Sequence, residues 1–214
     1  MLLDLVFPKK CIFCRRLLTD AETDLCHSCR TEAPDFSSSK NNIPFVAGWT
    51  AVWYYKDSVK HSIHRYKFRR ALSYADAYGR FLAMRIQQME VPYDYITWVP
   101  ISIWRRFSRG YDQVALLAKA VSKELDAPLL STLKKKRHNP AQSGIADPAH
   151  RKANVLGAYA VRGDADVSGK TILLIDDVIT TGATISECAK TLLAAGAKEV
   201  YCAAIASAHK NKKK

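Results

Sequence analysis

The sequence has no run of apolar residues long enough to cross a membrane, and glycine and proline are scarce, at 9 and 8 of 214 residues. A membrane-spanning helix needs about 20 consecutive apolar residues, so we expect no membrane insertion. The first eight residues are too short for a secretory signal, and Asp4 interrupts them. With 48% hydrophobic residues, the composition predicts a globular protein with one good core and a small appendage. We therefore expect a cytoplasmic protein.

Acidic residues are also few. The chain has 33 Lys and Arg against 20 Asp and Glu, which gives a formal net charge of +13. Lysine fills four of the last five positions, 210–214. This balance favours polyanionic partners, either phosphate-rich small molecules or nucleic acid, although lysine-rich tails are also common as purely solvated ends.

Cysteine is sparse, but four of the six are regularly spaced. Cys11, Cys14, Cys26 and Cys29 form a C-x2-C-x11-C-x2-C pattern. Four thiolates at this spacing can close tetrahedrally around zinc, which a reducing cytoplasm favours over two disulfides. The site should be structural, because four protein ligands leave no position open for water. His27 lies between the second pair and is an alternative ligand, although we expect an exposed spectator.

The zinc-binding head departs from a regular zinc ribbon in two ways. The gap between the cysteine pairs is short, and Arg15 and Arg30 stand where a glycine commonly follows the second cysteine of each knuckle. The polar stretch 35–42 has the composition of a linker. We therefore predict a zinc-binding, ribbon-like domain with its linker at residues 1–42 and a second domain at 43–214.

Strand and helix patterns alternate after the linker. Strands are expected at 48–55, 95–99 and 128–133, and helices from residue 60 onward, through 78–86 and through 114–125. This alternation predicts an α/β fold with a doubly wound parallel sheet.

The run 172–184 is the most informative part of the chain. Four aliphatic residues lead into Asp176 and Asp177 and then into a hydroxyl-rich loop around Gly182. The aliphatic part lacks polar alternation, which is typical of a parallel strand that is buried on both faces. Apolar residues at helical spacing over 185–193 predict that the loop opens a helix. An anion can therefore bind at this helix N-terminus.

The paired carboxylates favour a sugar phosphate over a nucleoside triphosphate. The chain has neither a GxxxxGK[ST] loop nor a GxGxxG loop, and carboxylates can accept hydrogen bonds from vicinal ribose hydroxyls. The run resembles the phosphoribosyl diphosphate (PRPP) motif of type I phosphoribosyltransferases. That resemblance implies catalytic roles for Asp176 and Asp177, which would hold the ribose hydroxyls and influence Mg²⁺. The residues that it implies for the 5′-phosphate are Thr180, Thr181, Gly182, Ala183 and Thr184.

A second resemblance covers the segment 99–118. It contains, in order, Val-Pro, a cluster of arginines, Arg-Gly-Tyr-Asp-Gln and Leu-Leu-Ala. These pieces, in this order, resemble the signature of the ComF/GntX family. That family joins an N-terminal zinc-binding head to a type I phosphoribosyltransferase-like domain. The resemblance implies that the loop after Val99 is a diphosphate loop. The basic residues that could serve it are Arg105, Arg106 and Arg109. Asp112 stands where the family usually has Asn, which puts a hydrogen bond from this side chain to an anion in doubt.

Further pieces of the chain bear on the same family. The resemblance extends to Tyr66, Lys67, Phe68, Arg137, Gln142, Arg151 and Asn154. The basic, aperiodic segment 133–154 is similar to the mobile loop that closes some transferase sites, or is a solvated turn. Thr180 occupies the position where enzymes for 6-oxopurines carry an Asp, so purine salvage is disfavoured.

Two functions stay open at this point. The first is a PRPP-binding protein of the competence type that handles single-stranded DNA during DNA uptake, with structural Zn²⁺, with Mg²⁺ accompanying PRPP, and with a competence helicase as an implied partner. The alternative is an active phosphoribosyltransferase that moves phosphoribose to an unidentified acceptor in metabolism. The net charge, the lysine tail and the aromatic and cationic run 66–70 favour the first, while an amphipathic helix end explains that run equally well.

Overall fold

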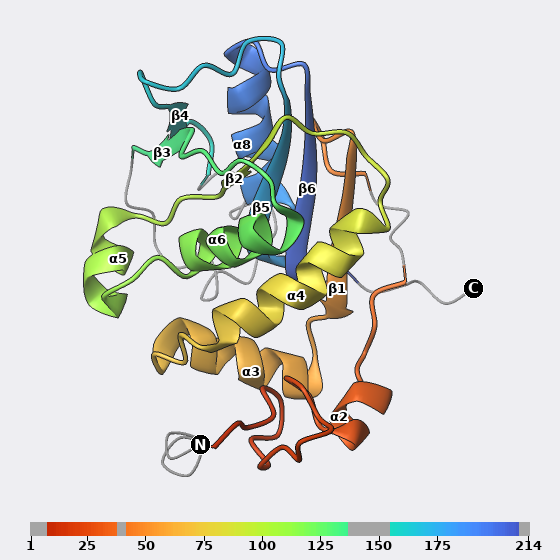
Figure 1. Cartoon of the computed structure of the whole chain (residues 1–214). Helices are drawn as coiled ribbons and strands as arrows, with labels where there is room; N and C mark the ends of the chain where they lie inside the picture. Colours follow the sequence, from red (N-terminus) through yellow and green to blue (C-terminus); the bar gives the residue numbers. More distant parts are fainter. Residues whose placement is uncertain (1–7, 38–41, 137–154, 210–214) are drawn as a thin grey trace.

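The computed structural model describes residues 8–37, 42–136 and 155–209 (Figure 1). The helices and strands in chain order are α2 (His27–Thr31), β1 (Gly48–Tyr54), α3 (Asp57–Phe68), α4 (Tyr74–Gln87), β2 (Tyr95–Trp98), α5 (Ile103–Arg109), α6 (Gln113–Leu125), β3 (Leu133–Lys135), β4 (Tyr159–Val161), β5 (Thr171–Ile179), α8 (Ala183–Ala194) and β6 (Glu199–Ser207). No helix within the described ranges is both long and apolar enough to cross a lipid bilayer.

The main sheet is parallel throughout and has the strand order β1-β6-β5-β2. Figure 1 shows α4 and α6 on one face and α8 on the other. The aliphatic residues of β5 alternate between the two cores. Leu173 and Ile175 pack in the core on the α4 and α6 side, whereas Ile172 and Leu174 pack on the α8 side. Burial on both faces explains the unbroken aliphatic run, and it confirms the predicted doubly wound parallel sheet.

The prediction of a strand at 128–133 is wrong. Of residues 128–132, only Leu129 forms a bridge, to Ile96 of β2. Leu133 begins β3, which pairs antiparallel with β4 in a separate two-stranded sheet. The carbonyl of Pro128 accepts a hydrogen bond from Ile96 N, but a proline has no N–H to extend the ladder. The chain therefore touches the edge of the main sheet here without becoming one of its strands.

A helix that the sequence analysis did not predict lies where we expected a diphosphate loop. Ser102 caps α5 by accepting a hydrogen bond from Arg105 N, and Gly110 ends the helix with φ 79°. Its apolar residues, Ile103, Trp104 and Phe107, are 65%, 67% and 77% exposed. The helix has only seven residues, fewer than the roughly 11 to 18 over which helical periodicity is judged, and its apolar side chains do not pack in the core.

The head packs directly on α3 and α4. Ile12 and Phe13 share a hydrophobic core with Trp53 of β1 and Tyr78 of α4, and the rings of Phe13 and Trp53 meet edge to face with centroids 5.0 Å apart. The guanidinium of Arg65 in α3 donates to the carbonyls of Ile12 and Phe13 at 2.8 and 2.6 Å. The head is thus part of the main core. The predicted boundary at residue 42 stays a prediction, because residues 38–41 lie outside the described ranges.

Candidate functional site

Asp176 and Asp177 are buried near the carboxyl end of β5, with exposed fractions of 8% and 6%. Their side chains serve opposite faces of the sheet, as successive residues of a strand do. Asp177 faces α3 and α6, where it contacts Lys67 and Gln113. Asp176 faces the α8 side, where its charge helps to raise the pKa of the buried Cys188 thiol, after burial itself. The two acids therefore have different neighbours although they adjoin in sequence.

Both oxygens of Asp177 are engaged. Lys67 Nζ lies 2.7 Å from Oδ1, and Gln113 Nε2 donates to Oδ2 at 3.0 Å. Burial works against the charge of Asp177, but the adjacent Lys67 ammonium and the Gln113 amide hold the pKa of this carboxyl below its ordinary value. Asp177 is therefore an ionised carboxylate that is largely withdrawn from water.

Asp176 behaves differently. Burial and the negative charge of Asp177 raise the pKa of Asp176 to about 8, although the backbone N–H of Asp177 donates to its Oδ1 at 2.8 Å. Asp176 therefore ionises less readily than Asp177. A protonated Asp176 can donate one hydrogen bond and accept others, which suits a hydroxyl-bearing ligand. A cation bound beside it would favour its ionised form.

Hydrogen bonds from the end of α3 to residues 111–113, at and just before the start of α6, hold the partners of Asp177 in place. The Tyr66 hydroxyl donates to the Gln113 carbonyl at 2.6 Å, and the Tyr111 hydroxyl donates to the Tyr66 carbonyl. Lys67 follows Tyr66 directly, so these bonds position both side chains that contact Asp177. Gln113 Oε1 is buried and has no hydrogen-bond partner among the described residues. A ligand hydroxyl could satisfy this acceptor.

Asp112 is the N-cap of α6, the helix that begins at Gln113. Its carboxylate accepts hydrogen bonds from the backbone N–H groups of Val114 and Ala115, at 3.0 Å each, and so caps α6. Asn and Asp are similarly good N-caps. Asp112, which stands where the family usually has Asn, therefore keeps a structural role as the N-cap of α6.

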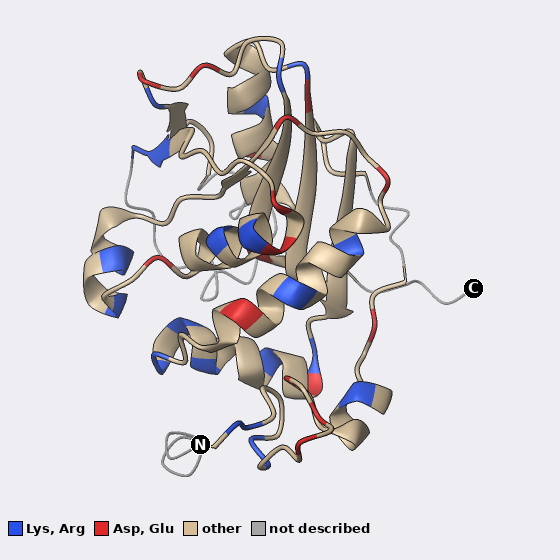
Figure 2. Ribbon diagram, in the orientation of Figure 1, with Lys and Arg blue, Asp and Glu red and all other residues tan. Residues whose placement is uncertain are grey.

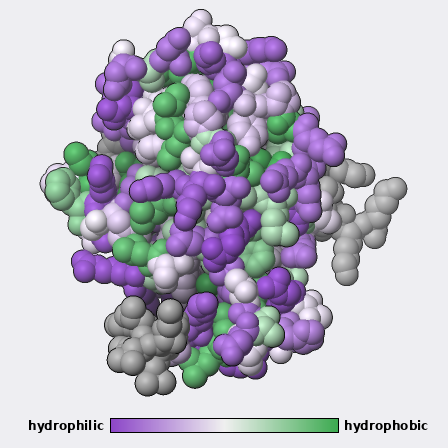
Figure 3. Space-filling model, viewed as in Figure 1, coloured by the Kyte–Doolittle hydropathy of each residue, from purple (hydrophilic) through white to green (hydrophobic). Residues whose placement is uncertain are grey.

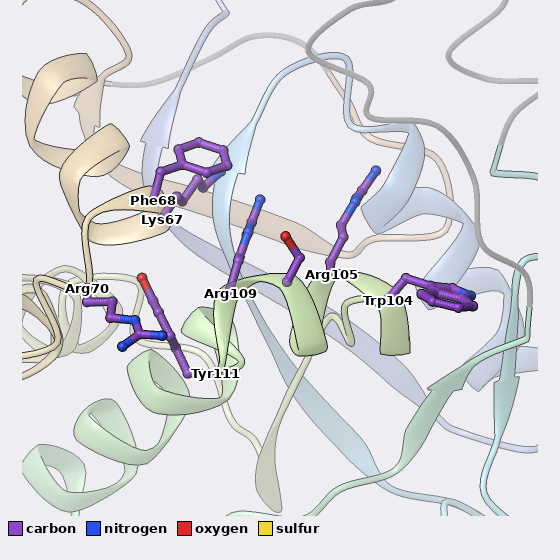
Figure 4. A pocket seen from close by; sticks show the side chains of 8 residues that line it. Lys67, Phe68, Arg70, Trp104, Arg105, Arg109 and Tyr111 are labelled. Carbon is purple, nitrogen blue, oxygen red and sulfur yellow. The ribbon is translucent and has the colours of Figure 1, made fainter.

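A pocket of about 600 Å³ opens beside Lys67 (Figure 4). Figure 4 shows Arg105 and Arg109 extending from the same side of α5, as residues four apart on a helix do. Burial lowers the pKa of Arg109, whose guanidinium lies 4.7 Å from the Phe68 ring centroid. No lining residue within the described ranges is acidic. The pocket is lined by Lys67, Phe68, Arg70, Trp104, Arg105, Ser108, Arg109 and Tyr111.

The arginines proposed from the sequence therefore divide into two groups. Arg105 and Arg109 line the pocket, whereas Arg106 is an exposed residue of α5 that does not line it. Lys67 and Arg70 bring two further cations from the end of α3 and the turn after it. The pocket thus combines cations from two segments, and its chemistry suits a multiply charged anion.

The predicted phosphate loop lies between β5 and α8, next to the acids. Gly182 has φ 74° and is the residue that precedes the first turn of α8. A Cβ at Gly182 would lie 3.0 Å from Ile43 Cγ1, so both the conformation and the space favour glycine. The Thr181 hydroxyl accepts a hydrogen bond from Ala183 N at 3.4 Å. Phosphate binding by residues 180–184 stays a prediction.

The four regularly spaced cysteines fit zinc. Their Sγ atoms all lie within 4.8 Å of one another, and those of Cys14 and Cys26 are 3.7 Å apart. Thiolates about 2.3 Å from a tetrahedral zinc are about 3.8 Å apart. Arg15 adopts φ 69°, the conformation that glycine usually takes in a knuckle, while Arg30 belongs to α2. His27 is exposed and is not part of the cluster.

Some of the residues singled out from the sequence lie outside the described ranges. They comprise the linker residues 38–41, most of the segment 133–154 with Arg137, Gln142, Arg151 and Asn154, and the lysine tail at 210–214. The site residues that sequence reasoning did not assign are Lys67, Phe68, Arg70, Trp104, Tyr111 and Gln113. Lys67, Phe68, Tyr111 and Gln113 lie in the stretches that carry the family resemblance, and this was the signal that could have identified them.

Comparison with known proteins gives two domain matches and several relatives. Residues 115–214 match the phosphoribosyl transferase domain, and residues 2–40 match the double zinc ribbon domain. Competence protein F of Haemophilus influenzae is 27% identical over 94% of this chain and 98% of its own length. DNA utilization protein YhgH of Escherichia coli is 32% identical over 65% of this chain and 64% of its own length. Competence protein ComFC of Streptococcus pneumoniae is 30% identical over 70% and 64%.

These matches agree with the order of the parts in the structure, a four-cysteine head followed by a parallel sheet with paired acids on β5. They confirm the expected type I phosphoribosyltransferase-like fold and the zinc-ribbon head. The chain therefore belongs to the ComF family of competence-type, phosphoribosyltransferase-like proteins.

Proposed function

We propose that the chain binds PRPP together with Mg²⁺ and acts in the handling of single-stranded DNA during DNA uptake. One observation carries the PRPP part: the cation-lined pocket and the buried carboxylate of Asp177 meet at Lys67, which belongs to both. PRPP carries a diphosphate and vicinal hydroxyls on one ribose, and so offers a group to each half of such a site.

Each part of the site has a matching group on PRPP. Arg105, Arg109 and Lys67 would neutralise the diphosphate, as charge-assisted hydrogen bonds to phosphate do. Asp176 and Asp177 would accept hydrogen bonds from the ribose hydroxyls, and residues 180–184 would bind the 5′-phosphate at the start of α8. Mg²⁺ is usually held by one or two carboxylates and by substrate phosphates, and keeps several waters. The acid pair beside the cationic pocket fits such an ion.

PRPP with Mg²⁺ should raise the melting temperature of the chain. At about 100 times Kd, a ligand stabilises the native state by about 2.7 kcal/mol, which shifts the melting temperature of a chain of this size by about 5–10 °C. Gly182→Ala should reduce the shift, because Ala disfavours φ 74° and its Cβ would crowd Ile43. Gly196→Ala is the matched control, with φ 101° at the other end of α8. A wild-type melting temperature that saturating PRPP leaves unchanged would contradict PRPP binding.

The surface of α5 supports the DNA part of the proposal. Trp104 and Phe107 are exposed beside arginines on this helix, and Figure 2 marks the basic residues of α5 in blue. The corresponding edge of the molecule in Figure 3 combines hydrophobic and hydrophilic side chains. Aromatic rings on which bases stack, next to cations that contact phosphates, are typical of surfaces that bind single strands. The three relatives reported above carry competence or DNA utilization in their names.

Single-stranded DNA should bind with a steep salt dependence, and the binding should weaken when α5 loses its rings. Stacking contributes about 1–3 kcal/mol per base, so Phe107→Ala should reduce affinity roughly 5- to 150-fold. Met84→Ala is the control, because Met84 is 59% exposed on α4. Removal of residues 210–214 should lower the slope of log K against log salt, by about 0.7 for each phosphate that the tail would otherwise neutralise. Fluorescence anisotropy on an oligonucleotide measures both, and an affinity indifferent to salt would exclude binding along the DNA backbone.

The alternative function is transfer of phosphoribose from PRPP to an unidentified acceptor. Diphosphate release, followed across nucleobases, amines and DNA, separates an enzyme from a PRPP-binding protein. A competence helicase is a proposed partner on the strength of the family alone. We place the protein in the cytoplasm because a site of four thiolates requires reduced cysteines.

A further inference from the structure

Lys67 joins two parts of the site that the ligand would use separately. Its ammonium lies 2.7 Å from Asp177 Oδ1, and its side chain lines the pocket with Arg70, Arg105 and Arg109. The Lys67 and Asp177 side chains are 19% and 9% exposed, so the ion pair is largely withdrawn from water. Figure 4 shows Lys67 at the end of α3, across the pocket from the arginines of α5.

The ion pair restricts access to Asp177. Lys67 holds one carboxylate oxygen and Gln113 holds the other. Gln113 is 3% exposed, and its backbone is tied to Tyr66, so its side chain has little freedom to leave. Breaking a buried ion pair without a replacement is strongly unfavourable. A ligand that brings hydroxyls but no anion for Lys67 therefore meets a carboxylate whose charge is already paired and whose access is narrowed by Lys67 and Gln113.

A diphosphate in the pocket supplies that replacement. Lys67 is an ammonium on a flexible four-carbon stem with three rotatable donors, so it can change partners without moving α3. The pocket concentrates cations, and Asp177 is in direct contact with one of them, Lys67. An anion with several charges beside Arg105 and Arg109 is thus a strong competitor for the Lys67 ammonium.

We infer that Lys67 couples the two halves of the site. A diphosphate in the pocket draws the Lys67 ammonium away from Asp177, and the released carboxylate oxygen then accepts hydrogen bonds from the hydroxyls of the ligand. This inference rests on the proposed PRPP site and gives it a specificity. The site selects sugar phosphates that carry a diphosphate, and it discriminates against ribose 5-phosphate, which offers the same hydroxyls and 5′-phosphate but nothing for Lys67. By linkage, each half of the site strengthens binding at the other.

The test is a titration of ribose 5-phosphate into the zinc-loaded chain with Mg²⁺, with and without saturating inorganic diphosphate. In the wild type we expect diphosphate to tighten ribose 5-phosphate binding on the order of tenfold. In Lys67→Met the carboxylate is already released, so ribose 5-phosphate alone should bind more tightly than to the wild type, and diphosphate should add little. A lysine that only attracted phosphate would give the opposite change in the variant.

Arg70→Met is the matched control. Arg70 lines the same pocket, and its change removes the same charge without touching Asp177, so the coupling should persist. The wild-type titrations need no variant and stand even if Lys67→Met fails to fold. Wild-type affinity for ribose 5-phosphate that diphosphate leaves unchanged, or coupling retained in Lys67→Met, would overturn the inference while PRPP binding stands. Failure of PRPP itself to bind would overturn the proposed function and this inference with it.

Discussion

Cys26→Ser is expected to lose its zinc and to melt far below the wild-type chain. Cys26 is 2% exposed and lies in the same hydrophobic core as Trp53 and Tyr78. Structural zinc binding in small metal-dependent domains is worth about 10–16 kcal/mol in apparent terms, whereas whole domains are stable by about 5–15 kcal/mol. Because the head contributes to the main core, loss of the metal should destabilise the entire chain by several kcal/mol.

The same substitution should weaken PRPP binding. Arg65 of α3 donates to the carbonyls of Ile12 and Phe13 in the head, and α3 carries Lys67 into the site. A disordered head would leave this helix without one of its supports. Metal analysis and calorimetric melting provide the measurements. His27→Ala, an exposed change inside the same knuckle, should keep about one zinc per chain. A Cys26→Ser chain that melts at the wild-type temperature without metal would refute a structural role for zinc.

Asp177→Asn is expected to abolish measurable PRPP binding while the chain stays folded. The change preserves the size of the side chain but removes the charge that pairs with Lys67 and accepts from Gln113. Hydrogen bonds to a charged group contribute about 1.5–3 kcal/mol each, so the loss of two hydrogen bonds to the ribose predicts a reduction in affinity of roughly 100-fold or more. The Lys67 ammonium can turn into the pocket, which limits the cost to the fold.

Asp164→Asn is the control for this change. Asp164 pairs with Arg162 at the surface, where its side chain is 73% exposed, so its removal should leave PRPP affinity and stability close to the wild type. Isothermal titration of both variants compares the two carboxylates directly. An Asp177→Asn chain that binds PRPP as tightly as the wild type would show that this carboxylate does not contact the ligand.

Local patterns were sufficient to predict the central elements. The aliphatic part of β5 is buried on both faces, and Ile185, Cys188 and Leu192 of α8 are buried at helical spacing, so the chemistry of each segment agrees with its place in the fold. The cysteine knuckles are likewise local, since two residues separate the ligands within each pair. Such patterns can be recognised without the fold because each lies within about a dozen residues.

The partners of Asp177 could not be predicted in this way. Lys67 and Gln113 lie 110 and 64 positions away from it, and only the packing of α3 and α6 over the sheet brings them together. Helix α5 was missed because its seven residues are too few for helical periodicity to be recognised. The packing of the head was missed for a different reason. Linker composition at 35–42 indicates a boundary but says nothing about contacts such as that of Phe13 with Trp53.

The central claim is that the acids of β5, the loop before α8 and the cationic pocket together form one PRPP site. Isothermal titration of PRPP with Mg²⁺ into the zinc-loaded wild-type chain tests it most directly, with Asp177→Asn titrated in parallel. We predict saturable binding at about one PRPP per chain for the wild type and no saturable heat for the variant. No binding to a folded, zinc-loaded wild-type chain, or equal binding by both chains, would contradict the claim.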